Sequence, residues 1–474
     1  MCHSQNGELI WANVIEATSA VQIKGITTDN SENIFITGSY SGTSATFYSQ
    51  NSDDNILLEA SQNHDTFIAK YDNHGNLLWA GVVAQSSALD RGFGIQVDSF
   101  GNIYIGGFWR GGNLNFSSSS ISIPYNSTIN WGNGFIAKLN SDFVPLWVST
   151  VVGGAYEGGV ARLNGGVALS NDDGIYASGP FQKTVYFDKT YYADGSELLL
   201  PETTYTAGTT IAQDVIAFKL NSDGSFGWAR HFSNTDKAGN SGNNINSNRD
   251  NGDVFFIGNF VGTITIQNES SADPVLLSSN GGEDNYIIKY NSDGIIDWAF
   301  SFGGLSNEGI NDVSHSNEIV TASGYFSGSV YLGSSIAIRD TLTSAGGTDM
   351  FLINLSNTGT YLSSTNLGGT LNEDMLSLDS DNLSNATVGG FFSSPNFRVG
   401  ENDLENGGSS DAFLAHHINI HLLPTVSEIS CSEGHDGTLG LEVFGGGQEP
   451  YSYEVSLVGG DEIDAGVYSA PLSY

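Results

Sequence analysis

Three histidines near the end of the chain, His416, His417 and His421, are the first candidates for metal chemistry. On a strand, His417 and His421 would share a face. Zinc sites usually combine histidine with cysteine or acidic ligands at short spacings, and no such partner lies close by. We therefore interpret the three histidines as the end of a strand and the start of a linker that leads to Pro424.

Aspartate-rich segments are a second group that could do chemistry, because their oxygen atoms suit calcium. Tight hairpin turns use the same residue types, and none of the segments matches the twelve-residue calcium loop that ends in Glu. The sequence predicts no required cofactor. If an ion is bound, calcium is the one that the acidic turns would suit. These segments are NSDG (221–224 and 291–294), DSFGN (98–102), SNDDG (170–174) and DSDN (379–382).

Catalytic motifs are not found in this sequence. It has no nucleophile elbow, no phosphate-binding loop that opens a helix and no zinc-protease helix. The glycine-rich GGAYEGG segment (153–159) does not precede a helical pattern, and the seven arginines are scattered. We assign no catalytic residue, and the sequence favours a non-catalytic function.

The elements that would position any site come from one repeated module. A first hairpin recurs in forms such as DTFIAKYDNHGNLLW (65–79) and DNYIIKYNSDGIIDW (284–298). A second hairpin alternates with it, as in GIQVDSFGNIYIGGFW (94–109). Apolar residues alternate along both, which predicts half-buried strands, and the Asx-Gly segments predict tight turns. Six copies of each hairpin indicate six modules.

Four strands per module predict a small sheet that buries its faces by stacking on neighbouring modules. The last module, near 374–418, provides only three strands, and the missing outer strand is present at the N-terminus as ELIWANV (8–14). We therefore predict an all-β fold, a six-bladed β-propeller over residues 1–423 that is closed by its N-terminal strand. Such closure removes an exposed sheet edge.

Aromatic residues fall into a repeated set and a variable set. The repeated set occupies one position in five modules, so we interpret it as packing between modules; it comprises Trp11, Trp79, Trp147, Trp228 and Trp298. The variable set lies in the long connections 110–132 and 182–213, where exposed aromatic rings would suit a sugar or a protein. These candidate ligand-binding residues are Tyr125, Trp131, Tyr186, Tyr191, Tyr192 and Tyr205. Short alternating segments such as TVYF and TITI in the connections also allow an alternative, in which they extend the sheets.

The net charge of −37 excludes nucleic acid and anionic membrane surfaces as partners. No apolar run approaches the ~20 residues that span a bilayer. Cys2 and Cys431 form no disulfide framework, and whether they pair is left open. Both ends are expected to be edges of a fragment of a longer chain.

The module resembles the bacterial β-propeller repeat family found in large secreted and surface proteins, over roughly residues 7–420. That family is associated with seven blades, whereas six are counted here. The tail 424–474 resembles a repeat of cell-surface adhesins from gliding bacteria, through Cys431, GHDG (434–437) and Pro450 to Tyr453. This second resemblance implies a partial immunoglobulin-like β domain.

Together the pattern and the resemblances predict a secreted or cell-surface binding module, monomeric within a longer chain, for a glycan or an extracellular protein. An alternative is a glycan-active hydrolase or lyase that uses the mouth of the propeller channel. A second alternative is a structural spacer. Fold resemblance does not decide among these functions.

Overall fold

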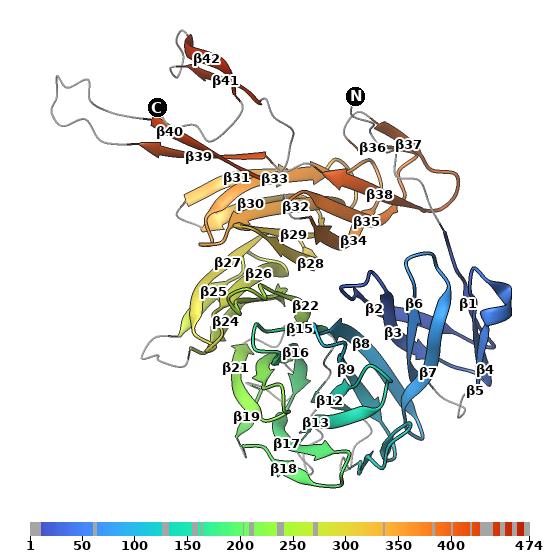
Figure 1. The fold of residues 1–474 in the computed structure, drawn as a ribbon. Helices are drawn as coiled ribbons and strands as arrows, with labels where there is room; N and C mark the ends of the chain where they lie inside the picture. Colours follow the sequence, from blue (N-terminus) through green and yellow to red (C-terminus); the bar gives the residue numbers. More distant parts are fainter. Residues whose placement is uncertain are drawn as a thin grey trace. The chain divides into compact units, whose positions relative to one another are not determined.

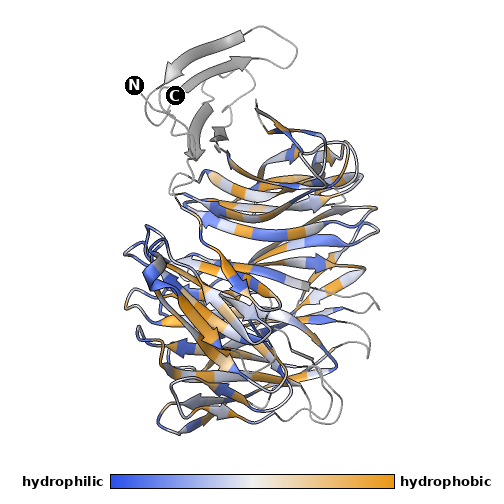
Figure 2. Ribbon diagram, turned by 90° about the vertical axis from the view of Figure 1, so that its right-hand side faces the viewer, coloured by the Kyte–Doolittle hydropathy of each residue, from blue (hydrophilic) through white to orange (hydrophobic). Residues whose placement is uncertain are grey.

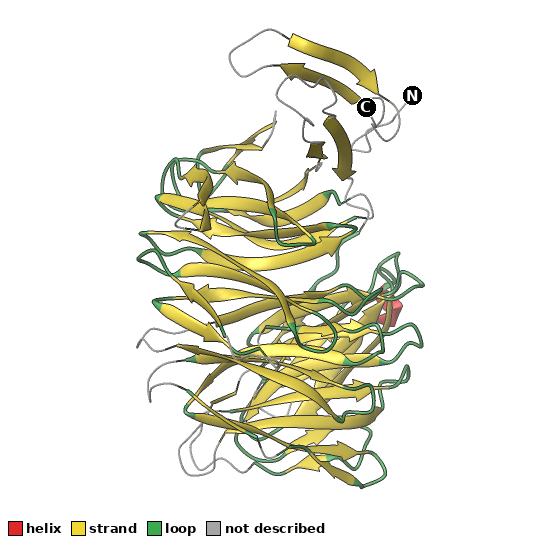
Figure 3. Ribbon diagram, turned by 90° about the vertical axis from the view of Figure 1, so that its left-hand side faces the viewer, coloured by secondary structure: helices red, strands yellow, loops and turns green. Residues whose placement is uncertain are grey.

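Figure 1 shows the computed structural model of the chain, which divides into two compact units, Met1–Ile310 (unit 1) and Asn311–Tyr474 (unit 2). Apart from one 3-10 turn at Ser52–Asp54, the regular elements of the described residues are strands (Figure 3), so the predicted all-β class is confirmed. None of the described helical residues forms a helix long and apolar enough to cross a membrane. The structure describes all residues except 1–10, 60–63, 126–131, 154–159, 162, 164, 202, 208–212, 235–240, 269–273, 335–336, 382–383, 400–401, 418–419, 427–438, 446–450, 457–461 and 469–474.

Unit 1 contains four successive modules of the same antiparallel pattern, in which an inner, a second, a third and an outer strand pair in that order. Module 1 has β2 (Val21–Thr28), β3 (Ile34–Tyr40), β6 (Asp65–Tyr71) and β7 (Leu77–Gln85). Module 2 has β8 (Leu89–Val97), β9 (Ile103–Arg110), β12 (Asn133–Leu139) and β13 (Pro145–Gly153). Module 3 has β14 (Val160–Ala161), β15 (Val167–Leu169), β16 (Ile175–Gln182), β20 (Asp214–Leu220) and β21 (Phe226–Asn234), and module 4 has β22 (Ser241–Ser247), β23 (Val254–Phe260), β26 (Asp284–Tyr290) and β27 (Ile296–Gly304).

The hairpin turns follow from their Asx and glycine residues. In the turn after β6, Asp72 Oδ1 accepts the backbone N–H groups of His74 and Asn76 at 2.9 and 2.8 Å. Gly75 adopts a φ of +82°, a left-handed conformation that costs glycine no steric strain. The turn after β8 repeats this arrangement, with Asp98 as the acceptor and Gly101 at +82°. These local bonds fix the register of each hairpin.

The long connections between second and third strands fold into further hairpins, as the alternative interpretation of their alternating segments predicted. Each hairpin pairs with the outer strand of the preceding module: β10 with β7, β17 with β13 and β24 with β21. Consecutive modules are therefore interlocked by backbone hydrogen bonds as well as by side chains. The hairpin strands are β10 (Leu114–Phe116), β11 (Ser122–Ile123), β17 (Thr184–Tyr192), β18 (Glu197–Leu199), β19 (Thr204–Thr206), β24 (Thr263–Ile266) and β25 (Val275–Ser278).

The N-terminal hairpin of unit 1 also pairs with a strand that precedes its own module. The hairpin of β4 (Ser44–Phe47) and β5 (Ile56–Glu59) pairs with β1 (Ile15–Ala17). Because β4 and β5 belong to module 1, β1 occupies the position that the outer strand of a preceding module would take. Among the described residues of unit 1, β1 pairs only with β4, so its other edge has no strand partner.

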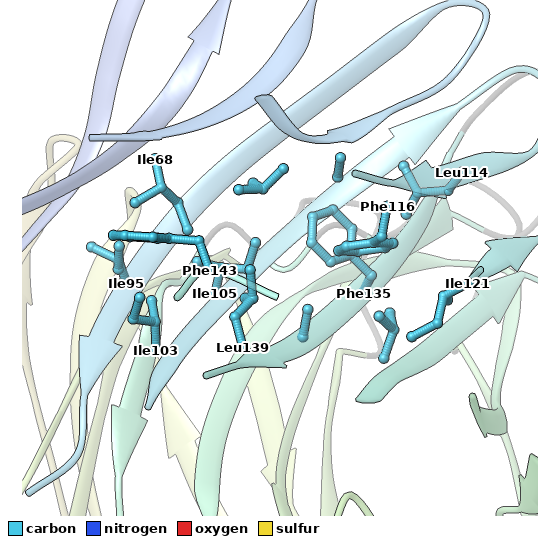
Figure 4. Close-up of a cluster of buried hydrophobic side chains, with 14 of the residues drawn as sticks. Ile68, Ile95, Ile103, Ile105, Leu114, Phe116, Ile121, Phe135, Leu139 and Phe143 are labelled. Carbon is cyan, nitrogen blue, oxygen red and sulfur yellow. The ribbon is translucent and has the colours of Figure 1, made fainter. Parts of the chain in front are cut away.

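The apolar core lies between the modules. Along many strands apolar and polar segments alternate (Figure 2), as expected for sheets that bury alternate residues. One cluster joins Phe35 and Ile68 of module 1 to Ile95, Ile105 and Phe135 of module 2 (Figure 4). The same kind of cluster recurs between modules 2 and 3 and between modules 3 and 4. Because these apolar faces are buried only between successive sheets, a single module is not expected to fold stably alone.

Unit 2 contains a further four-stranded sheet and a three-stranded sheet of the same pattern. The first has β28 (Gly309–Ser316), β29 (Ile319–Phe326), β32 (Asp349–Ser356) and β33 (Tyr361–Leu367). The second has β34 (Glu373–Ser380), β35 (Ala386–Phe392) and β38 (Asp411–His417). The remaining hairpins are β30 (Ser329–Ser334) with β31 (Ala337–Thr343), β36 (Asn396–Val399) with β37 (Asn402–Glu405), β39 (Ile420–Val426) with β40 (Leu439–Gly445), and β41 (Tyr451–Ser456) with β42 (Glu462–Tyr468).

Candidate functional site

Four of the repeated tryptophans contact the hairpin turn of the following module: Trp11, Trp79, Trp147 and Trp228. The indole N–H groups of Trp11, Trp147 and Trp228 donate to the backbone carbonyls of Asn73, Ser222 and Ser292 at 3.0–3.1 Å. Each ring covers the glycine of that turn: a Cβ on Gly294 would lie 2.6 Å from the ring of Trp228. These rings are therefore committed to contacts between modules and are not free to stack on a ligand.

The candidate ligand-binding tyrosines lie on the outer hairpins of modules 2 and 3 and do not converge on one surface. Tyr191 is buried in the cluster between modules 1 and 2, and Tyr125 and Tyr186 are half-buried against the same cluster. Tyr192 and Tyr205 pack instead against the cluster between modules 2 and 3. Strand alternation turns Tyr191 and Tyr192 to opposite faces. The register shift between Ser149 and Val151 lets Tyr186 and Tyr191, five residues apart, reach the same cluster. Trp131 lies outside the described residues.

The candidate ligand-binding tyrosines on β17 and β19 are held by specific contacts. The hydroxyl of Tyr192 donates to the carbonyl of Asp223 at 2.9 Å, and the ring of Tyr205 meets Phe187 edge-on. Burial raises the pKa of Tyr186, Tyr191, Tyr192 and Tyr205. They are neutral at physiological pH, and any ligand contact would use the ring face or the hydroxyl.

The acidic turns direct their carboxylates inward to their own backbone. Asp98 Oδ2 accepts from the side-chain amide of Asn102 at 2.8 Å, and its Oδ1 binds two backbone N–H groups. Asp72, Asp29 and Asp381 make the same contacts with the Asn four residues later. Within the described part of the chain, no three His, Cys, Asp or Glu side chains are grouped so as to hold a metal ion. His416 Nδ1 lies 3.0 Å from Thr387 Oγ1, and the side chains of His417 and His421 lie outside the described residues.

The third strands carry a repeated lysine whose ammonium lies over an aromatic ring. Lys70 Nζ is 4.8 Å from the Phe35 ring centroid, and Lys138 Nζ is 4.9 Å from that of Tyr104. In module 4 the corresponding Lys289 pairs with Asp253 at 2.7 Å, and both side chains are buried. These contacts join the second and third strands of a module, which is a structural use of the lysine.

Pairs of buried carboxyl groups, which the sequence analysis missed, recur where one module passes to the next. In each pair the first acid is the first residue of a third strand, and the second acid comes 24 or 25 residues later. The backbone N–H of the second acid donates to the carbonyl of the residue that precedes the first acid. Thus Asp90 N–H donates to His64, Glu308 N–H to Glu283 and Glu373 N–H to Thr348, at 2.8–2.9 Å. The pairs are Asp65 with Asp90, Asp284 with Glu308 and Asp349 with Glu373. The fixed spacing is the signal that could have revealed them.

An open apolar groove of about 370 Å³ lies on the first sheet of unit 1. Trp11, Ile15, Val21, Ile23, Ile26, Ile34, Ile36 and Tyr71 line it together with Asn13. Ile26 is 66% exposed, whereas Ile95, its counterpart in module 2, is 2% exposed because module 1 covers it. The groove is therefore the face that a preceding module covers elsewhere in unit 1.

Leucines are exposed on the outermost hairpin strands of modules 1, 3 and 4; two of them, Leu57 and Leu276, lie opposite equivalent threonines, Thr46 and Thr265. They are Leu57 on β5, Leu199 on β18 and Leu276 on β25, and each follows or precedes a leucine that packs inward. None of the three belongs to the core, so they form a set of exposed apolar contacts on the hairpins that differ most between modules.

Comparison with known proteins gives one distant likeness. No family model matches the chain. A stretch of 144 residues is 30% identical to an uncharacterized WD repeat-containing protein of Acanthamoeba polyphaga mimivirus. The match covers 30% of this chain and 10% of that protein, so the chain spans only a small part of the relative. With the repeated antiparallel sheets, this likeness fits a β-propeller-like repeat protein.

Proposed function

We propose that the chain is a non-catalytic binding module of a secreted or cell-surface protein, and that its partner is another protein. The observation that carries the proposal is the exposed leucine set, Leu57, Leu199 and Leu276, on hairpins fixed to interlocked sheets. Apolar side chains beside unpaired strand edges favour a partner that adds along the rim. The name of the WD-repeat relative supports a binding or scaffold function of the propeller type.

The test uses the intact chain, tagged and cross-linked to the surface proteins of cells of its source, followed by mass spectrometry. A triple variant, Leu57→Ser/Leu199→Ser/Leu276→Ser, should lose the cross-linked partner that the unaltered chain retains. Phe100→Ser is the control, because Phe100 is even more exposed than the three leucines but lies on a hairpin turn. If the triple variant recovered the same partner in the same amount as the unaltered chain, the proposed binding surface would be contradicted. If the partner were absent from the surface-labelled proteins, the proposed cell-surface location would be contradicted.

A glycan is the second candidate partner, favoured by the half-exposed ring of Tyr192 on β17. A glycan array is screened with calcium and again with chelator. Saturable binding that Tyr192→Ser abolishes would support a sugar site on β17. Binding lost only in chelator would instead support the acidic turns as calcium sites. No binding in either condition would exclude the glycan candidate in this form.

We also propose that the six modules form one closed ring, with the N-terminal strand as the outer strand of the last sheet. Two observations, each made within one unit, support this. In unit 1, Trp11 stacks on Tyr71 and donates to Asn73, as later tryptophans do from the outer strand of a preceding module. In unit 2, Leu414 on the edge strand β38 is 75% exposed, whereas its counterpart Ile68 in module 1 is fully buried.

The register of this closure follows from the modules that are complete. Lys70 pairs with Trp79 and Ala69 with Ala80, and the lysine–tryptophan pair recurs in modules 2, 3 and 4. By equivalence Trp11 would pair with His416 and Ala12 with Ala415. Directly opposed residues in an antiparallel pair have Cβ atoms about 4.5–5.5 Å apart, within reach of a disulfide.

The closure is tested by a disulfide in a chain whose Cys2 and Cys431 are replaced by Ser. Ala12→Cys/Ala415→Cys should oxidise within one chain and raise the unfolding midpoint. Ala12→Cys/Leu414→Cys is the matched control, because a shift of one residue places the two side chains on opposite faces. Equal oxidation of both variants, or of neither, would contradict the proposed register.

A further inference from the structure

The pair Asp284 and Glu308 differs from the other carboxyl pairs in having an unpartnered oxygen on each side chain. Asp284 Oδ2 accepts the backbone N–H and the side-chain amide of Asn280 at 3.0 and 3.1 Å. Glu308 Oε2 accepts the N–H of Gly304 at 3.1 Å. Asp284 Oδ1 and Glu308 Oε1 are buried and have no hydrogen-bond partner. Both residues are essentially inaccessible to solvent, at 1% and 0% exposure.

The backbone brings the two residues together, and the charge of Asp284 acts on Glu308. Glu308 N–H donates to the carbonyl of Glu283, the residue before Asp284, at 2.9 Å. The carboxyl of Asp284 lies against the Cα of Gly303, where an added Cβ would be 2.5 Å from Oδ1. The loop between β27 and Glu308 therefore closes directly over the pair.

The charges around the pair do not neutralise it. The ionisable groups that act on Glu308 are Asp284 and Glu283, and both are acidic. In module 3 the corresponding Asp214 has a partner, because His231 Nε2 lies 2.7 Å from its Oδ2. Ser301 occupies the place of His231 in module 4, opposite Tyr286. Two ionised carboxylates at this depth would repel each other without compensation.

We propose that Asp284 and Glu308 share one proton, carried on Glu308 Oε1 and donated to Asp284 Oδ1, and that this bond is a pH-sensitive latch on the Gly303–Glu308 loop. The proton pairs the two free oxygens and leaves one negative charge, which the Asn280 donors stabilise. Burial raises the pKa of Glu308 to about 8 and that of Asp284 to about 6, in agreement with a proton that stays on the glutamate at neutral pH. Above that range the second charge appears and the loop is expected to loosen.

The amide variant Glu308→Gln tests the proposal, because its NH₂ group can donate to Asp284 Oδ1 at every pH while its oxygen accepts from Gly304. Unfolding midpoints are measured at pH 7, where the pair holds one proton, and at pH 9. At pH 7 the variant and the unaltered chain should agree. At pH 9 the variant should unfold at a higher temperature, by about 2 °C or more. Hydrogen exchange at Gly304, corrected for the intrinsic rate, should accelerate at pH 9 only in the unaltered chain.

The matched control is Glu373→Gln in the neighbouring pair. Both oxygens of Glu373 accept backbone N–H groups, from Gly369 at 2.8 Å and Ser394 at 3.0 Å. An amide would turn an N–H toward one of these donors, so this variant should lose stability at both pH values. A Glu308→Gln variant that is less stable than the unaltered chain at pH 9 would overturn the proposal. Calcium is the second check. If it raised the unfolding midpoint of the unaltered chain at pH 9 but not that of Glu308→Gln, the pair would bind a cation, and the proposal would be overturned.

Discussion

The rings of Trp79 and Phe143 lie 3.6 Å apart and only 2° from parallel, one from the outer strand of module 1 and the other from the turn of module 2. Other modules place glycine at the position of Phe143, under the preceding tryptophan. Phe143 occupies it at a φ of +62°, a conformation that is strained for a residue with a Cβ. The stacking contact offsets this strain, whereas in other modules the tryptophan ring lies directly on the glycine.

A double-mutant cycle should detect the Trp79–Phe143 contact. We expect Trp79→Leu and Phe143→Leu each to destabilise unit 1, with a coupling energy of about 0.5–1.5 kcal/mol from the ring pair. Urea unfolding of the single and double variants measures it. Additive single effects would mean that the stack contributes nothing beyond the burial of each ring.

The glycine under a tryptophan should be more sensitive than a glycine of the same backbone conformation in the open. Gly294 has a φ of +74° and lies under Trp228, whereas Gly195 has a φ of +86° and nothing within 4 Å of an added Cβ. Gly195→Ala should cost about 1 kcal/mol for the left-handed conformation alone. Gly294→Ala should cost at least about 1 kcal/mol more, because the Cβ displaces the indole. Thermal unfolding compares the two, and equal costs would show that the ring moves freely.

Ion pairs of the repeated lysine should differ in strength with burial. Lys289→Met leaves Asp253 buried without its cation and should destabilise the chain by about 3 kcal/mol. Lys70 and Asp29 are 3.7 Å apart and more exposed, so Lys70→Met should change stability by less than about 1 kcal/mol. Chemical unfolding at neutral pH measures both. A large effect of Lys70→Met would contradict this, because methionine keeps most of the apolar stem and removes only the charge.

The carboxyl of Asp90 should make stability fall as the pH rises. It accepts the backbone N–H and hydroxyl of Ser86, and burial raises its pKa to about 7. A raised pKa means that the folded state binds the proton more tightly than the unfolded chain, where the pKa is about 3.9. The contribution is complete below pH 4 and is lost between about pH 4 and pH 7. Asp90→Asn should therefore reduce the loss of stability between pH 5 and pH 8, and an unchanged slope would contradict this.

The sequence by itself determined the strands, because alternation and Asx-Gly turns are local signals. The hairpin of Asp65–Tyr71 and Leu77–Gln85, for example, is encoded by DTFIAKYDNHGNLLW, and Asp72 closes its turn through bonds within five residues. The tryptophan position was equally visible, since a residue repeated in five modules stands out against variable neighbours.

Only the tertiary structure decided where the variable connections go. Nothing local distinguishes a hairpin that pairs with its own module from one that pairs with the preceding outer strand, as β17 does with β13. That choice places Tyr191 in a core and Tyr192 against a different one. The proximity of Asp284 and Glu308 has the same origin, because the two acids are 24 residues apart and a backbone bond from Glu308 to Glu283 brings them together.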